Sequence, residues 1–366
     1  MIEYESLINV NRKYLTEIET AVSRVIRSGY YVLGEEVGSF EAEFSQFMGS
    51  KYCVGVANGL DALTLGILAL DLPIKSDILV PSNTYIATIL AIIHAGHHPV
   101  LVEPDPGTLN INTKLLQNAM TRITRAICVV HLYGASCDMN SVKEFSEKNG
   151  LRIIEDCAQS HGARYKNQLT GTFGDIGCFS FYPTKNLGAM GDAGAIITND
   201  ILMAEKIRYL RNYGSKEKYK NKYIGYNSRL DEIQAAILRV KLKYLNEMND
   251  YKRLLAKRYF ELLPDCLQLP NRSPERFDVH HIFPVLTKKR DSLRDFLLKN
   301  GIKTEIHYPI PPHKQESLSN VILGDYPISS MVHENILSLP ISIGMNIEDI
   351  GRVSGLINDF FKQAKE

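Results

Sequence analysis

The amino-acid sequence predicts an α/β fold with a mostly parallel central sheet flanked by helices, followed by a smaller C-terminal α+β domain. Between about residues 50 and 200, short β-rich runs alternate with helical patterns, as in a parallel sheet joined by helical crossovers. Several of these runs are continuously apolar, which is typical of strands covered by helices on both faces. With 366 residues, the chain is long enough for two domains with cores of their own.

Seven strands are expected in the large domain, and the apolar runs Ile78-Leu-Val and Cys128-Val-Val belong to the second and fourth of them. The expected strands span residues 52–57, 77–81, 99–103, 126–132, 152–155, 176–181 and 195–198.

Residues 228–264 are predicted to form one long helix, because apolar side chains recur there at helical spacing and no proline interrupts it before its last residue. This helix would connect a large domain, residues 1–245, to a small domain, residues 246–366. The small domain is expected to contain a strand that begins at Phe283, a helix over 290–300 and a terminal helix after a proline-rich stretch.

The charge balance and the hydropathy exclude several classes of protein. With 42 Lys and Arg against 41 Asp and Glu, the chain lacks the strongly basic character of most nucleic-acid and membrane-surface binders. Its longest mainly apolar run, residues 86–93, is too short to cross a bilayer, and its acidic start does not resemble a signal peptide. We therefore expect a cytoplasmic protein.

The six cysteines show no C-x-x-C pair and mostly lie in apolar, strand-like runs such as Ile-Cys-Val-Val. This pattern is typical of reduced thiols in a protein core, so we expect neither disulfides nor a metal site.

The first chemically suggestive segment is Ser180-Phe-Tyr-Pro-Thr-Lys185-Asn-Leu-Gly188, which glycines at 191 and 194 follow. The proline excludes a helix interior, and the glycines leave open space beside Lys185 on a loop after a buried strand. A ligand could fill that space. A loop lysine alone is more often a solvated surface residue.

A second segment, Arg152-Ile-Ile-Glu-Asp156-Cys-Ala-Gln159-Ser-His161, is an apolar strand that ends in an acid. Ligands in open α/β sheets bind at the carboxyl ends of strands, where Asp156 could hold a cation. Capping of a helix or pairing with a structural arginine would explain the same acid.

A third segment reads as strand, Asn58-Gly59 turn and helix start, beginning at Tyr52. The N–H groups at such a helix start bind phosphate well, although the same pattern also serves as a plain turn with a helix cap. Pyridoxal 5′-phosphate (PLP) would use all three segments: an amine for the Schiff base, an acid for the pyridine nitrogen and a cradle for the phosphate. No P-loop or dinucleotide-binding fingerprint is present.

A basic segment over residues 208–226 has two interpretations, a solvated loop or a surface that meets a phosphorylated substrate. Its cations are Arg208, Arg211, Lys216, Lys218, Lys220 and Lys222, and its one acid is Glu217.

Over nearly its whole length the chain resembles the DegT/DnrJ/StrS family of PLP-dependent nucleotide-sugar aminotransferases, which have fold type I. Five ordered segments carry the resemblance: Pro81-Ser-Asn-Thr-Tyr-Ile-Ala-Thr, Glu155-Asp-Cys-Ala-Gln-Ser-His-Gly, Phe179-Ser-Phe-Tyr-Pro-Thr-Lys-Asn-Leu-Gly, Gly225-Tyr-Asn-Ser-Arg-Leu-Asp-Glu-Ile-Gln-Ala-Ala and Ile306-His-Tyr-Pro.

The resemblance implies a role for each matching residue. Lys185 would be the Schiff-base lysine and Asp156 the partner of the pyridine nitrogen, with Tyr85 on one face of the ring and Gln159 near the other face or the ring hydroxyl. The phosphate would be held by the Gly59 and Leu60 amides, the Ser180 hydroxyl and Asn227 of a second subunit, so the active site would lie at a homodimer interface. The implied candidates for substrate contact are Tyr182, Arg229, His307 and Tyr308.

The resemblance also implies ping-pong transamination, in which L-glutamate supplies the amino group that a nucleotide-linked keto sugar receives, for the synthesis of unusual sugars or surface glycans. Asn58-Gly-Leu-Asp-Ala-Leu and Asp156-x-x-Gln159 are similar to the branch that aminates C3 of a dTDP-3-keto-6-deoxyhexose. The alternatives are a C4-aminating relative, a PLP-binding regulatory protein without turnover, and a structural protein that binds no cofactor. His-Tyr-Pro could also be only a loop before a proline turn.

Overall fold

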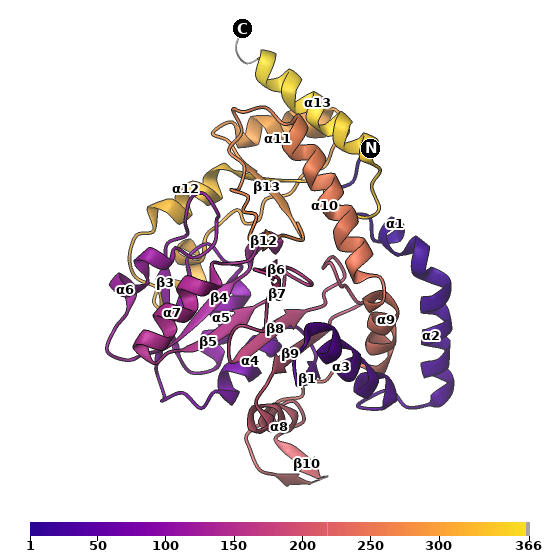
Figure 1. The fold of residues 1–366 in the computed structure, drawn as a ribbon, viewed down its shortest axis with the longest axis vertical. Coiled ribbons are helices and arrows are strands. Elements are labelled where there is room, and N and C mark those ends of the chain that lie inside the picture. The colour runs from indigo at the N-terminus through magenta and orange to yellow at the C-terminus, as the bar shows by residue number, and fades with distance from the viewer. Residues whose placement is uncertain (218, 364–366) are drawn as a thin grey trace.

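The computed structural model describes residues 1–217 and 219–363, and its large domain is built on a seven-stranded sheet with the strand order β1-β9-β8-β5-β4-β2-β3 (Figure 1). Only β9 runs antiparallel to its neighbours, and the other neighbouring pairs are parallel. The strands are β1 Tyr52–Val56, β2 Asp77–Pro81, β3 His98–Val102, β4 Thr124–Val130, β5 Arg152–Asp156, β8 Ile176–Ser180 and β9 Gly194–Thr198. The α/β prediction and all seven expected strands are confirmed.

Helices cover both faces of this sheet, which is why its strands are apolar without alternation. Neighbouring residues of one strand enter different cores, as Cys53 packs with α2, α3 and α9 while Val54 packs with α4, α5 and α8. These helices are α2 Leu15–Ser28, α3 Glu35–Met48, α4 Gly59–Ala69, α5 Ile86–His94, α8 Ile201–Leu210 and α9 Glu232–Leu242. Helix α7, Met139–Asn149, contributes to a further core beside β4.

The small domain has its own core, in which the antiparallel pair β13–β14 packs with long helices. Its main elements are α10 Leu245–Leu262, β13 Phe283–Leu286, α11 Arg290–Lys299, α12 Pro327–Asn335, β14 Ile336–Leu339 and α13 Ile347–Gln363. The expected strand at Phe283 and the helices at 290–300 and at the end are therefore confirmed. The remaining helices and strands are short: α1 Leu7–Asn11, α6 Leu116–Ala119, β6 Arg164–Tyr165, β7 Gln168–Leu169, β10 Ser215–Glu217, β11 Lys220–Asn221 and β12 Arg276–Phe277.

The prediction of one helix over 228–264 is wrong, because α9 ends at Leu242 and α10 begins at Leu245. At the break, Tyr244 leaves helical geometry (φ −105°, ψ 0°), and its ring lies 4.9 Å from that of Tyr14. The break lets α9 pack against the large-domain core and α10 against the small-domain core. The division at residue 245 stays a prediction, although α10 begins there.

The N-terminal residues cross to the small domain. Ile2 packs in the small-domain core, its N–H donates to the Gly301 carbonyl (2.8 Å), and its own carbonyl accepts from the Lys303 N–H (3.0 Å). Across residues 1–217 and 219–363, no helix is long and apolar enough to span a membrane.

The end of β5 is held by Glu155, whose fully buried carboxylate accepts hydrogen bonds from the N–H groups of Gly171, Phe173 and Gly174 at 2.7 Å. His131 lies 3.0 Å away through Nε2, and because its Nδ1 accepts from the Cys137 N–H, Nε2 carries the proton and donates it to Glu155. With Cys157, these side chains are of metal-ligating types within 4.8 Å of one another. Their hydrogen bonds already use the Glu155 oxygens and both His131 nitrogens, which makes the group a structural anchor beside Asp156.

We predict that Glu155→Gln lowers the free energy of unfolding by about 2–4 kcal/mol, because an amide group would face backbone donors that now meet a carboxylate. Urea denaturation measures the change. The matched control is Glu144→Gln on the exposed face of α7, which should leave stability within about 0.5 kcal/mol of wild type. Equal stabilities of the two variants would contradict the anchoring role.

Candidate active site

A cavity of about 610 Å³ lies at the carboxyl ends of β4, β5 and β8, where residues of the small domain complete its lining. This is the place at which open α/β sheets bind ligands. The lining includes ten of the twelve site residues predicted from the sequence: Gly59, Leu60, Tyr85, Asp156, Gln159, Ser180, Tyr182, Lys185, His307 and Tyr308. The fold therefore brings segments that are far apart in the sequence to one cavity.

Lys185 lies on the loop that leaves β8, where its own N–H donates to the Tyr182 carbonyl (2.8 Å). The loop turns tightly, since a Cβ on Gly188 would collide with the carbonyl of Pro183. The Lys185 Nζ lies 3.5 Å from Nε2 of His281. Burial lowers the pKa of Lys185 to about 8; the Asp156 carboxylate opposes this shift, and the Lys252 charge adds to it.

Asp156 ends β5 and is 5% exposed. One carboxylate oxygen accepts from the Thr88 hydroxyl (2.8 Å) and the other from the Ala158 N–H (3.1 Å). Burial raises the pKa of Asp156, while these hydrogen bonds and the Lys185 charge oppose the shift. A buried acid at a cavity wall favours a cationic ligand atom, such as a protonated ring nitrogen.

Helix α4 begins at the cavity with N–H groups available for an anion. Asn58 caps the helix through the Asp61 N–H (2.8 Å), and its carbonyl accepts from Ala62, so the Gly59 and Leu60 N–H groups are not used by the cap. A Cβ on Gly59 would lie 2.5 Å from the Cβ of Ser180, which shows how closely the Ser180 hydroxyl approaches the helix start. Glycine at this position keeps the cradle open for a phosphate.

Two tyrosines and a glutamine form one wall of the cavity. The Gln159 amide accepts from the Tyr133 N–H (2.6 Å) and donates to the Tyr308 hydroxyl (2.9 Å). The ring of Tyr308 lies 5.0 Å from that of Tyr85, which is 52% exposed and so free to cover a planar ligand.

His307 is held by its Nδ1 beside the Ser338 hydroxyl (2.9 Å) and by its carbonyl, which accepts from Tyr133 (2.7 Å). Burial and the Lys185 charge lower the pKa of His307 to about 4, so the ring is neutral near pH 7. Tyr182 lines the cavity and is half exposed.

Asn227 and Arg229 do not line the cavity of their own chain. Asn227 is exposed and forms an isolated backbone bridge with Asn212. The Arg229 guanidinium donates to the Asn212 side chain (3.0 Å) and lies over the Tyr213 ring. The Asn227 contact with a second subunit remains a prediction, and so does any substrate contact of Arg229.

The cavity lining also includes polar residues that the sequence did not single out, among them Thr84, Thr88, Asp192 and His281. Thr88 lies inside a motif already noted, but only the fold shows that its hydroxyl meets Asp156. His281 is part of a His-His pair between expected elements, and no local pattern places it beside Lys185.

Comparisons with known proteins agree with this geometry. The model of the DegT/DnrJ/EryC1/StrS aminotransferase family matches residues 13–358. A dTDP-3-amino-3,6-dideoxy-alpha-D-galactopyranose transaminase of Aneurinibacillus thermoaerophilus is 49% identical over 361 residues, covering 98% of this chain and 99% of the relative.

Two solved structures are similar over most of the chain. DesV of S. venezuelae, crystallised in complex with a ketimine intermediate, has a TM-score of 0.95 at 40% identity, and the match covers 97% of each chain. NtdA of Bacillus subtilis, crystallised with the bound cofactor PMP, has a TM-score of 0.90 at 28% identity, covering 98% of this chain and 85% of NtdA.

We predict that Lys185→Met stabilises the cofactor-free protein most at pH 7 and progressively less up to pH 10. An unfolded lysine titrates near 10.4, whereas the folded pKa is about 8, so the unfolded chain binds more protons between these values. Wild-type stability therefore rises with pH in this interval, and the advantage of the variant shrinks. Urea denaturation at four pH values measures the difference. The control Lys257→Met, on the exposed face of α10, should show no such trend, and a constant difference for Lys185→Met would contradict the lowered pKa.

Proposed function

Because the chain belongs to the DegT/DnrJ/EryC1/StrS aminotransferase family, we propose that it transfers the amino group of L-glutamate to C3 of a dTDP-linked 3-keto-6-deoxyhexose. The products are then a dTDP-3-amino-3,6-dideoxyhexose and 2-oxoglutarate. The observation that supports this proposal most strongly is the meeting of Lys185, Asp156 and the start of α4 at one cavity. The relative that is 49% identical is named for a sugar with its amino group at C3.

The residues of the cavity fit PLP. When bound, PLP supplies an aldehyde that reacts with amines and a ring that withdraws electrons from the adjacent carbon. Asp156 would hold the protonated ring nitrogen, and the Gly59 and Leu60 N–H groups with the Ser180 hydroxyl would hold the phosphate. Tyr85 would cover one face of the ring, and Gln159, fixed by Tyr133 and Tyr308, would lie near the other face or the ring hydroxyl.

Lys185 is the residue that would move protons. Since its pKa is about 8, a useful fraction of the amine is neutral near physiological pH. A neutral Nζ can act as a nucleophile and can take a proton from Cα of the amino donor. In the second half of the reaction it can deliver a proton to the sugar carbon that receives the amino group. His307 is neutral in the same pH range and can take part in hydrogen bonding to the sugar without adding positive charge.

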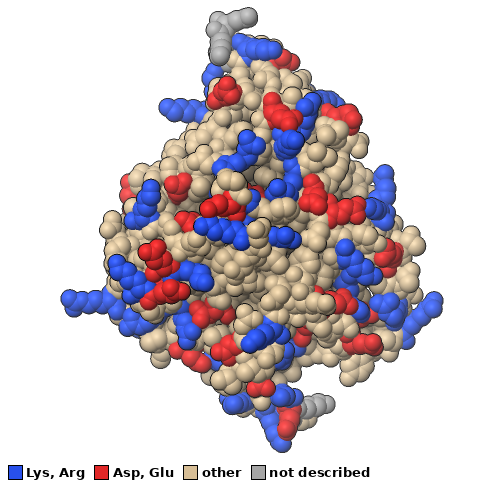
Figure 2. Space-filling view, viewed as in Figure 1, with Lys and Arg blue, Asp and Glu red and all other residues tan. Residues whose placement is uncertain are grey.

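The nucleotide end of the substrate would extend past Tyr182, His307 and Tyr308. The segment 208–226 supplies exposed cations, including Lys216 and Lys222, that would meet the diphosphate of a substrate bound by the neighbouring subunit. Arg211 is unavailable for this role because it is buried against Glu41 (2.5 Å), and Lys218 lies outside the described residues. Figure 2 shows acidic and basic side chains interspersed over the face of the molecule that it draws, so the recognition of phosphate would be local.

A homodimer completes the proposal. Asn227 is exposed and does not line the cavity of its own chain, which leaves its side chain free to serve a neighbouring subunit. Location in the cytoplasm stays a prediction from the sequence; a reducing environment there would suit the six free cysteines of the described chain.

The second candidate is a C4-aminating enzyme of the same family, since nothing in the cavity lining fixes which sugar carbon approaches Lys185. Incubation with paired 3-keto and 4-keto nucleotide sugars, followed by identification of the aminated carbon, separates the two. Amination of the 4-keto sugar alone would replace the leading proposal.

We predict that PLP-loaded wild-type protein has a visible absorbance band that glutamate bleaches and a 3-keto sugar restores. Lys185→Ala should lose the band and reduce amino transfer by about a thousandfold or more, because nucleophile and base are removed together. Lys257→Ala is the control for an exposed lysine. A band that glutamate never bleaches would favour the regulatory alternative or another donor, and full transfer by Lys185→Ala would refute the proposal.

We also predict that two inactive variants complement each other. A mixture of Lys185→Ala and Asn227→Ala subunits should recover activity, because one of the two sites in each mixed dimer then has both side chains. Subunits are mixed in mild denaturant, reassociated and assayed. Separate variants treated in the same way are the control, and no recovery in a mixture that dimerises would refute the shared site.

A further inference from the structure

A second, much smaller cavity also touches Lys185. Its volume is about 20 Å³, enough for about one water molecule, and its polar lining includes Glu5, Thr184, Asn186 and Lys252. Lys252 lies on α10 and is 4% exposed, which is unusual for a lysine that forms no direct ion pair. No ion pair of Lys252 occurs within residues 1–217 and 219–363.

The Lys252 ammonium donates hydrogen bonds to two residues beside Lys185, one adjacent in the sequence and one in space. Its Nζ donates to the carbonyl of His281 (3.1 Å) and to the side-chain oxygen of Asn186 (3.3 Å). His281 is the residue whose ring approaches the Lys185 amine, and Asn186 follows Lys185 in the chain. The Asn186 amide in turn donates to Asn249 (2.8 Å) and to the Val279 carbonyl (3.0 Å).

A second buried lysine holds the same loop further along. Lys241 is 1% exposed, and its Nζ donates to the carbonyl of Gly188 (2.6 Å). Glu5, which the N-terminal segment brings in, accepts from the Ser342 hydroxyl (2.7 Å) and is the acid whose charge acts on both lysines. The loop of Lys185 is thus tied to α9, to α10 and, through Glu5, to the small domain.

We propose that Lys252 is a positioning residue for the transfer reaction: its ammonium fixes Asn186 and His281 around Lys185 and places a positive charge behind the reactive amine. This inference rests on the proposed function only in giving Lys185 its reactive role. The charged groups around Lys185 are Asp156, Lys252 and Glu5, which lines the small cavity together with both lysines. The rings of His161, His281 and His307 are neutral near pH 7 because burial lowers their pKa values.

The positive charge of Lys252 lowers the pKa of Lys185, an effect that its hydrogen bonds alone would not produce. A like charge disfavours the protonated form of a neighbouring amine, so Lys252 lowers the pKa of Lys185. Burial also lowers the pKa of Lys252 to about 8, with Glu5 opposing. Below that pH, the charged Lys252 increases the fraction of Lys185 amine that is neutral. Removing the Lys252 charge would therefore leave Lys185 more fully protonated.

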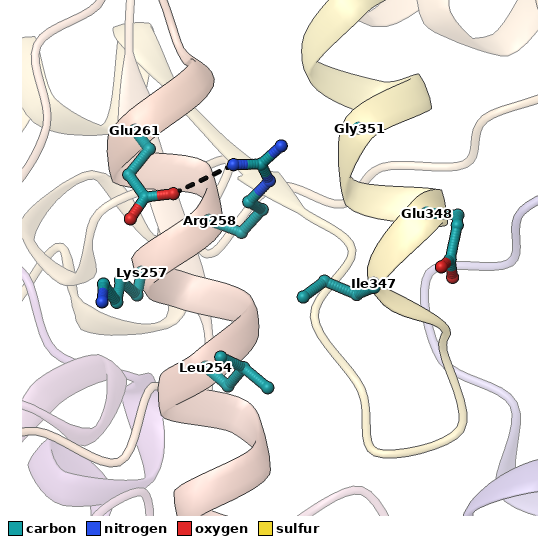
Figure 3. Close-up of a pocket in the computed structure, with 7 residues that line it drawn as sticks. All are labelled: Leu254, Lys257, Arg258, Glu261, Ile347, Glu348 and Gly351. Carbon is teal, nitrogen blue, oxygen red and sulfur yellow. Dashed lines mark hydrogen bonds and ion pairs between the residues drawn. The ribbon is translucent and has the colours of Figure 1, made fainter.

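The test compares Lys252→Met with Lys257→Met, which changes a lysine on the opposite, solvent-facing side of the same helix. Figure 3 shows Lys257 beside a groove between α10 and α13, where Arg258 pairs with Glu261. Lys185 does not line this groove. The readout is the rate at which the cofactor-free protein develops the absorbance of bound PLP, measured from pH 6 to pH 10.

In Lys252→Met, we expect the midpoint of this pH–rate profile to rise by about half a unit or more, and kcat to fall about tenfold with little change in the KM of glutamate. Lys257→Met should match wild type. Asn186→Ala keeps the Lys252 charge but breaks one of its contacts, so it should slow PLP attachment without moving the midpoint.

A folded Lys252→Met protein with the wild-type rate and midpoint would overturn the inference. If Lys252→Met does not fold, as judged by circular dichroism, Asn186→Ala decides, and an unchanged attachment rate in that variant would overturn it equally. The proposed function fails separately: wild-type protein that attaches PLP through Lys185 but aminates no keto sugar would refute the sugar reaction and leave the role of Lys252 in place.

Discussion

The structure depends on the placement of an amine and an acid at the ends of two neighbouring parallel strands. Asp156 ends β5 and Lys185 follows β8, and the pairing of these strands brings both side chains to one cavity. Each is costly to bury. Hydrogen bonds from Thr88 and Ala158 offset part of the cost for the acid, and Glu155 anchors the strand behind it. Lys252 ties the lysine loop, although its charge adds to the cost of a protonated Lys185. An amine whose pKa has fallen to about 8 is the chemical result.

Much of this arrangement follows from local sequence. The seven strands were predictable because each is a short apolar run between turn residues, and strands buried on both faces have the clearest pattern. Lys185, Asp156 and Gly59 were predictable because they lie after a strand, at the end of a strand and at a helix start, where sheet geometry brings them together. The other predicted residues that line the cavity were expected from the resemblance of their motifs to those of the family.

What the sequence did not reveal depends on contacts between distant segments. The break before α10 arises because the residues on either side pack against different cores, although the helical pattern continues across it. His281 and Lys252 gain their importance from the position of the small domain, and neither belongs to a local motif. Asn227 and Arg229 do not line the cavity of their own chain, so the subunit contact predicted for Asn227 and the substrate contact predicted for Arg229 stay predictions.

The crossing of the N-terminal residues into the small domain has a consequence for biosynthesis. Ile2 pairs with Ile302, and its backbone forms hydrogen bonds with those of Gly301 and Lys303, so this segment cannot reach its native position before residues 301–303 have been synthesised. Contacts between segments so far apart in the sequence form late, and such long-range closure slows folding. Because Glu5 lies in the same segment as Ile2, the charges around Lys185 reach their final balance only when this segment has docked on the small domain.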